Sequence, residues 1–87
     1  METRVALIGI MVEHNESVDK LNALLSQYGD YIIGRMGIPY HKKDLSLISI
    51  AIDAPADVIS ALSGKIGRLK GLSAKVIYNK TDKTALV

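Results

Sequence analysis

Val5-Ala6-Leu7-Ile8-Gly9-Ile10-Met11-Val12 is the stretch that decides the fold, because it is an uninterrupted apolar run rich in Val and Ile. The polar residues Glu13-His14-Asn15 close the run. A short run of this kind is typical of a central strand with apolar contacts on both faces. It is far shorter than the roughly 20 apolar residues needed to cross a bilayer, so we expect no membrane segment.

After this run, segments with the hydrophobic spacing of a helix alternate along the chain with segments expected to be strands. A helical stripe extends from Val18 to Tyr28, with Asn15 or Ser17 as its expected cap and Gly29 as an expected left-handed residue at its end. A second helix opens at Pro55 and ends at Gly71. The remaining three strands are expected at 31–40, 45–53 and 73–78.

The resulting order is strand, helix, strand, strand, helix, strand, and its two halves align. Ile8 corresponds to Ile50, and Gly29 corresponds to Gly71, at the same offset. We therefore predict an α+β, ferredoxin-like βαββαβ fold, with a four-stranded antiparallel sheet and two helices on one face. A single domain is expected over residues 1–80, with a polar C-terminal tail at 81–87.

The face of the sheet opposite the helices is also predicted to be apolar. A sheet face in contact with water should carry polar residues, so an apolar one indicates a partner surface, with the chain tail folding over it as the alternative. We expect self-association as a dimer or tetramer. The expected oligomer interface consists of Val5, Leu7, Gly9, Met11, Leu45 and Leu47.

Composition narrows the class of protein. The 87 residues are 48% hydrophobic, carry a net charge of +2 and contain no cysteine, which is typical of a folded domain in a reducing cytosol. We expect a cytoplasmic protein. The basic turn His41-Lys42-Lys43 is too small for an electrostatic footprint on nucleic acid, and both helices are needed to cover the sheet. No sequence-specific DNA binding by this chain alone is expected.

Two segments carry a resemblance to a known family. Tyr-Gly-Asp-Tyr-Ile-Ile-Gly-Arg-Met-Gly-Ile-Pro-Tyr at 28–40 and Asp-Ala-Pro-Ala-Asp-Val-Ile-Ser-Ala-Leu-Ser-Gly-Lys-Ile-Gly at 53–67 are similar to the iron-only hydrogenase system regulators. That family is similar in plan to ACT domains and to the C-terminal domain of the nickel-responsive repressor. The resemblance implies a regulatory or accessory role, exerted through contact with a hydrogenase-system protein or through a small effector bound at subunit interfaces. It implies no catalytic residues.

Candidate effector or partner-binding residues fall in two places. The ACT resemblance implies a site at Glu13, His14 and Asn15, whose alternative reading is a capping loop. Gly34, Arg35 and Gly37 interrupt an apolar strand, so a ligand carboxylate or a partner is expected to approach them closely. The alternative reading of Arg35 is a charge that protects an edge strand from aggregation.

Chemistry-bearing patterns are sparse. No nucleophile, base and orienting group stand in a recognisable arrangement, so we predict that the protein is not an enzyme. The two histidines, His14 and His41, lack the spacing of a metal site, and no metal or cofactor is assigned. The alternative function left open is a metal-binding sensor whose site lies between subunits and includes one of these histidines.

Overall fold

A four-stranded antiparallel sheet forms the centre of the protein, as seen in a computed structural model that describes residues 2–13 and 15–80. The sheet order is β2-β3-β1-β4, so the two central strands are the first and the third along the chain. The predicted ferredoxin-like arrangement is confirmed. The elements are β1 (Arg4–Val12), η1 (Asn15–Ser17), α1 (Val18–Gln27), η2 (Gly29–Tyr31), β2 (Ile32–Tyr40), η3 (His41–Lys43), β3 (Leu45–Ala54), α2 (Ala56–Gly67) and β4 (Leu72–Tyr78).

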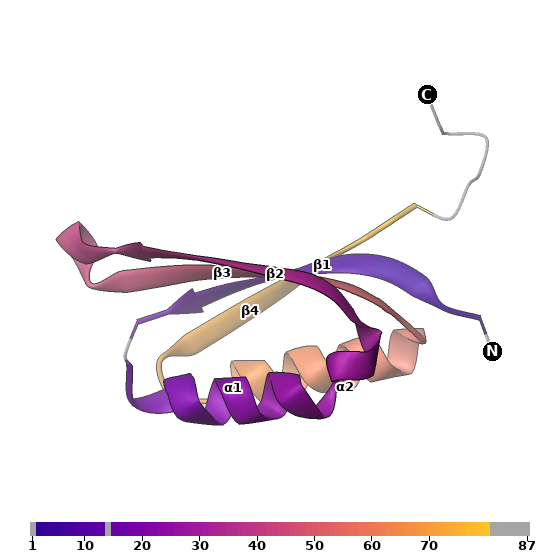
Figure 1. Ribbon diagram of the computed structural model, residues 1–87, viewed down its shortest axis with the longest axis horizontal. Coiled ribbons are helices and arrows are strands. Elements are labelled where there is room, and N and C mark those ends of the chain that lie inside the picture. The colour runs from indigo at the N-terminus through magenta and orange to yellow at the C-terminus, as the bar shows by residue number, and fades with distance from the viewer. Residues whose placement is uncertain (1, 14, 81–87) are drawn as a thin grey trace.

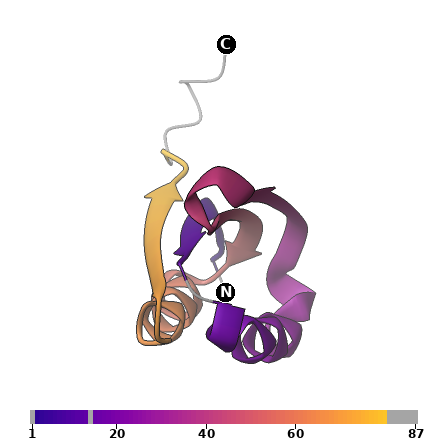
Figure 2. The ribbon, with the colours of Figure 1, turned by 90° about the vertical axis from the view of Figure 1, so that its left-hand side faces the viewer.

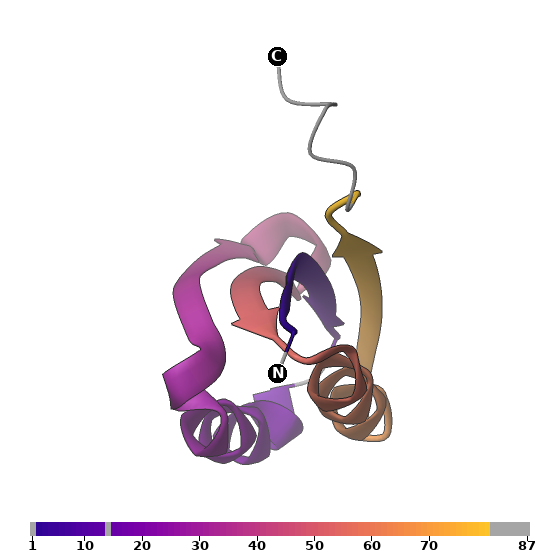
Figure 3. The ribbon, with the colours of Figure 1, turned by 90° about the vertical axis from the view of Figure 1, so that its right-hand side faces the viewer.

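Both helices lie on the same side of the sheet, which is plain when the sheet is viewed edge-on in Figure 1 and end-on in Figures 2 and 3. Every second residue of β1 points into this layer and is buried, because side chains alternate along a strand. The core combines these side chains with those of β3 and the two helices. The buried apolar residues are Ala6, Ile8, Ile10, Val12, Leu21, Leu25, Ile50, Ile52, Ala54, Ile59, Leu62, Ile66 and Leu72.

The register is continuous between β1 and its neighbours and is broken once in β2. Ile32 pairs with Ile52, but Gly34 pairs with Ala51, so Ile33 is an extra residue in a β-bulge. A bulge changes which face of the sheet the following side chains occupy. From Gly34 to Tyr40 the strand again follows a regular register.

Three local expectations about the ends of the helices need correction. Ser17 is the N-cap residue of α1, but its side chain caps no backbone amide. Its hydroxyl donates instead to the carbonyl of Lys70 at 2.8 Å. Gly29 has no positive φ and begins η2, because the chain continues from α1 into a second tight turn. The second helix ends at Gly67, and Gly71, with φ of 78°, lies in the turn that leads into β4.

Over the described residues, neither helix reaches the length and apolar character that crossing a membrane would require.

Candidate functional site

The sheet face opposite the helices is the candidate site, because it exposes most of the large apolar side chains that are accessible to water. On β1, Leu7 is 47% exposed and Met11 is 48% exposed, whereas the intervening Ile8 is 0% exposed. Ten large hydrophobic residues are exposed among those described, and eight belong to this face by their register. These eight are Val5, Leu7, Met11, Met36, Ile38, Tyr40, Leu47 and Ile77.

Strand pairing arranges these residues in rows across the sheet. Met11 pairs with Leu47, and Leu47 pairs with Ile38, which produces an apolar row over three strands. The next row contains Gly9, Ser49 and Met36. We call the whole surface the open face; it consists of residues 5, 7, 9 and 11 of β1, 34, 36, 38 and 40 of β2, 45, 47, 49, 51 and 53 of β3, and 73, 75 and 77 of β4.

All six residues predicted as the oligomer interface lie on the open face. Leu45 is partly buried, and Leu47 is 36% exposed. The contribution of the two edge strands was missed at the level of sequence, although Met36, Ile38 and Tyr40 follow a period of two that could have indicated it.

A hollow of about 320 Å³ lies in the middle of the open face. Its floor is at Gly9, the one position of β1 without a side chain. A Cβ built on Gly9 would come no closer than 4.0 Å to any atom, the nearest being the carbonyl oxygen of Lys75. The packing of this chain therefore does not require glycine at this position. The lining residues are Gly9, Ile10, Met11, Met36, Ile38, Leu47, Ile48, Ser49, Ser73, Ala74 and Lys75.

The two glycines of β2 lie on opposite faces of the sheet. Gly34 pairs with Ala51 and belongs to the open face, and no atom lies within 4 Å of a Cβ built on it. Gly37 pairs with Ile48 on the helix side, where an added Cβ would be 3.8 Å from the Ile48 side chain. Neither glycine is required by a close contact within the chain.

Arg35 also lies on the helix side, opposite Ile50. Its guanidinium donates a hydrogen bond of 2.8 Å to the Asn22 side chain of α1, at an exposed position. Arg35 therefore connects the edge strand to a helix and does not project from the open face beside Gly34.

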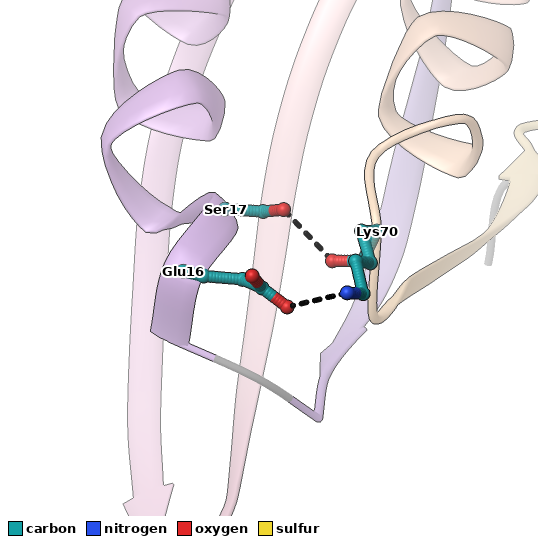
Figure 4. A network of polar contacts seen from close by, with 3 residues as sticks. All are labelled: Glu16, Ser17 and Lys70. Atoms are coloured by element: carbon teal, nitrogen blue, oxygen red, sulfur yellow. Dashed lines mark hydrogen bonds and ion pairs between the residues drawn. The ribbon is translucent and has the colours of Figure 1, made fainter.

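The loop after β1 is joined to the loop between α2 and β4. The backbone amide of Glu13 donates to the carbonyl of Gly71 at 2.7 Å. Glu16 forms an ion pair with Lys70 at 3.5 Å, and the Ser17 hydroxyl bonds to the Lys70 carbonyl; Figure 4 shows both contacts. Ser17 is 4% exposed, and sequence reasoning did not foresee this contact because its acceptor lies far away in the chain.

The two predicted groups of effector residues are not brought together within one chain. Glu13 is exposed and follows the end of β1, and Asn15 begins η1; His14 lies outside the described residues. The end of β1 is level with Pro39, because Val12 and Pro39 both pair with Ser46. Along β2, Gly37 is two residues and Gly34 five residues from Pro39, roughly 7 Å and 17 Å, and β3 lies between β2 and β1.

Among residues 2–13 and 15–80, the structure brings together no group of three or more metal-ligating His, Asp or Glu side chains. His41 is exposed in η3. The intersubunit metal site stays a prediction, since one of its two candidate ligands, His14, lies outside the described residues.

The fold and the open face together define a ferredoxin-like domain with two helices on one side and an apolar sheet on the other. Residues 4–76 match the model of the TM1266-like family, whose description is "Iron-only hydrogenase system regulator, putative". The match covers most of the chain, and the protein belongs to this family. The resemblance predicted from the sequence is confirmed.

A solved structure agrees with this assignment. The uncharacterized protein TM1266 from Thermotoga maritima is 29% identical in sequence, with a TM-score of 0.87. The similarity covers 91% of this chain and 100% of the other. A comparison with proteins of curated function gives no significant match.

Proposed function

We propose that this protein is a small regulatory domain of the iron-only hydrogenase system that works as a homo-oligomer, with the open faces of two copies packed together. The observation that carries the proposal is the gathering of eight large exposed apolar side chains on one sheet face. A solvated sheet face is normally polar, and a contiguous apolar one marks an interaction surface. Regulation then acts through protein contact or through a small effector held between subunits.

The size of the open face supports a second copy as the partner. Four strands about 4.8 Å apart and about eight residues long give roughly 500 Å² per copy, or roughly 1,000 Å² for a pair. That value is just below the roughly 1,200–2,000 Å² of stable specific interfaces, so weak association, observable at micromolar concentration, is expected.

The charges of the open face are compatible with two-fold packing. By register, Asp53 and Lys75 are the charged residues of the open face, and they have opposite signs. In an isologous contact the same patch meets itself, so a strongly one-signed face would repel its copy. The open face avoids this repulsion.

The packing of the two helices supports a regulatory role that does not involve sequence-specific contacts with DNA. Leu21 and Leu25 of α1 and Ile59, Leu62 and Ile66 of α2 are buried against the sheet. Both helices are thus used for packing, and any effect on transcription is proposed to be indirect. A gel-shift assay at physiological salt should show no sequence-specific complex; one that survives an excess of random DNA would overturn this part of the proposal.

The experiment that tests the oligomer is sedimentation velocity across a micromolar concentration range. We expect the wild type to associate and Ile38→Asp to be monomeric, because the new carboxylate would be desolvated in the interface. Ile33→Asp is the matched control: Ile33 is 62% exposed on the same strand, compared with 54% for Ile38, but it occupies the bulge. A monomeric wild type, or equal loss of association in both variants, would refute the face-to-face contact.

A further inference from the structure

Gly9 occupies the centre of β1, and no close contact within the described residues requires a glycine there. Interior glycine costs a strand about 0.5–1 kcal/mol relative to alanine. Among the described residues, the nearest atom to a Cβ built at this position is the Lys75 carbonyl oxygen at 4.0 Å, which is an ordinary contact distance, so steric exclusion does not account for the glycine. Glycine at this position makes the hollow deeper, because a side chain at residue 9 would fill its floor.

The walls of the hollow are apolar and adaptable. Met11 and Met36 line two sides, with Ile38 and Leu47 between them. Methionine has three rotatable bonds and a polarisable sulfur, so it adjusts to the shape of an apolar guest. The volume of about 320 Å³ is within the range of small-molecule sites, which are mostly apolar with a few convergent polar groups.

The few polar residues that line the hollow flank β1, with Ser49 on β3 and with Ser73 and Lys75 on β4. Lys75 on β4 is the single charged residue among those lining it, and the hydroxyls of Ser49 and Ser73 are the side-chain polar groups nearest in register. The other charge of the open face, Asp53, is four residues along β3 from Ser49, or roughly 13 Å. The hollow is therefore apolar, with one cationic side chain, Lys75, among its lining residues.

We propose that the Gly9 hollow binds a medium-chain apolar carboxylate, with the hydrocarbon between the two methionines and the carboxylate at Lys75. The proposal deepens the effector role proposed above and rests on it, since the ligand lies on the face that a second copy covers. Burial of the hydrocarbon supplies most of the binding free energy. The Lys75 ammonium, with serine hydroxyls as further donors, selects the anionic head over a neutral one.

To test the proposal, the full chain is titrated with decanoate, and the chemical shifts of its backbone amides are followed by NMR. Decanol tests the anionic head and butanoate tests the hydrocarbon. We expect decanoate to shift residues of β1, β3 and β4 around Gly9 and to bind at least about tenfold more tightly than butanoate, because a shorter chain buries less apolar surface. Shifts confined to the helices, or equal affinity for the two acids, would refute the proposal.

Variants at two positions, Gly9 and Lys75, test the residues of the proposed site. Gly9→Val fills the floor of the hollow and should weaken decanoate at least about tenfold; Gly9→Ala, a smaller change, replaces it if the valine variant fails to fold. Lys75→Met should remove the preference for decanoate over decanol, and Lys75→Arg should restore it. Lys43→Met is the control, since Lys43 is exposed in η3 away from the hollow. Unchanged decanoate affinity in a folded Gly9 variant would refute the site.

The ligand proposal and the self-association proposal can be refuted independently of each other. If the wild type is monomeric but decanoate binds at Gly9, only the oligomer is refuted. If the wild type associates, decanoate does not bind, and the Gly9 and Lys75 variants lose association, then a second copy fills the hollow and the ligand proposal is refuted.

Discussion

The two faces of the sheet are built from the same strands and are almost equally apolar, yet the helices and loops of the described residues, 2–13 and 15–80, cover only one of them. In β1, Ile8 and Ile10 are at most 2% exposed, whereas their neighbours Leu7 and Met11 are close to half exposed. The covered face is explained by the chain itself, since α1 and α2 pack on it. The open face has the composition of a core without the layer that would complete one. Hydrophobicity therefore predicts which residues need a partner, but not whether that partner belongs to the same chain.

The largest difference between the two faces is expected in how strongly a substitution on each face lowers the free energy of unfolding. Ile8→Ala should lower the free energy of unfolding by about 3 kcal/mol, because it leaves a cavity in a closed core. Leu7→Ala, its neighbour on the open face, should cost less than about 1 kcal/mol in a monomeric Ile38→Asp background, because its side chain is already near water. Urea denaturation of both variants measures the difference. Similar losses would show that the open face is covered within a single chain.

The covered layer is also held at its edge by Ser17. Ser17→Ala should reduce the free energy of unfolding by about 1 kcal/mol, since the part-buried hydrogen bond from Ser17 to the Lys70 carbonyl would be lost. The same change should leave self-association unaltered, because Ser17 lies outside the open face. Thermal unfolding and sedimentation of the same sample check both expectations, and a change in association would connect the two sides of the sheet.

A substitution at Gly34, on the open face, is expected to have the opposite effects on stability and on association. Gly34→Val adds a side chain at a position where, among the described residues other than its chain neighbours, no atom lies within 4 Å of an added Cβ. We expect the monomer to gain about 0.5 kcal/mol from better strand propensity, while association weakens because the new side chain prevents close approach. Unfolding in the Ile38→Asp background gives the first value, and sedimentation of the single variant gives the second. Unaltered association would place Gly34 outside the contact.

The smallest effect is expected for the ion pair between Glu16 and Lys70. Its side chains are 55% and 77% exposed, so Glu16→Gln should cost less than about 0.5 kcal/mol. Comparison with Ser17→Ala by urea denaturation separates the exposed contact from the buried one at the same junction. A larger loss for Glu16→Gln would mean that charge, not the buried hydroxyl, holds the two loops together.

The fold was predictable because its signals are local and repeated. The period of two in 45–53 and the helical stripe from Val18 to Tyr28 each identify an element, and the order of elements then leaves few topologies. The ends of elements were less predictable. The role of Ser17 depends on Lys70, more than fifty residues away, so no local pattern contains it.

The open face was predicted from the central strands but not from the edges. In β2 the bulge at Ile33 changes the face on which later residues lie, so Ile32 faces the helices although Gly34, Met36 and Ile38 do not. A plain alternation would have placed all four together. The same bulge explains why Arg35 contacts Asn22 of α1 and is separated from Gly34.

The pairing of β1 with β4 has a mechanical consequence. The strands are antiparallel, and Arg4 lies beside the end of β4: its guanidinium is 4.3 Å from the centroid of the Tyr78 ring, and the Asn79 amide donates to the Val5 carbonyl. A load applied between residues 4 and 79 would therefore pull β4 away from the sheet from one end. The hydrogen bonds between these strands run across the pair, so each would carry the load in turn. This protein should extend at low force, with β4 leaving first and β2 and β3 still paired.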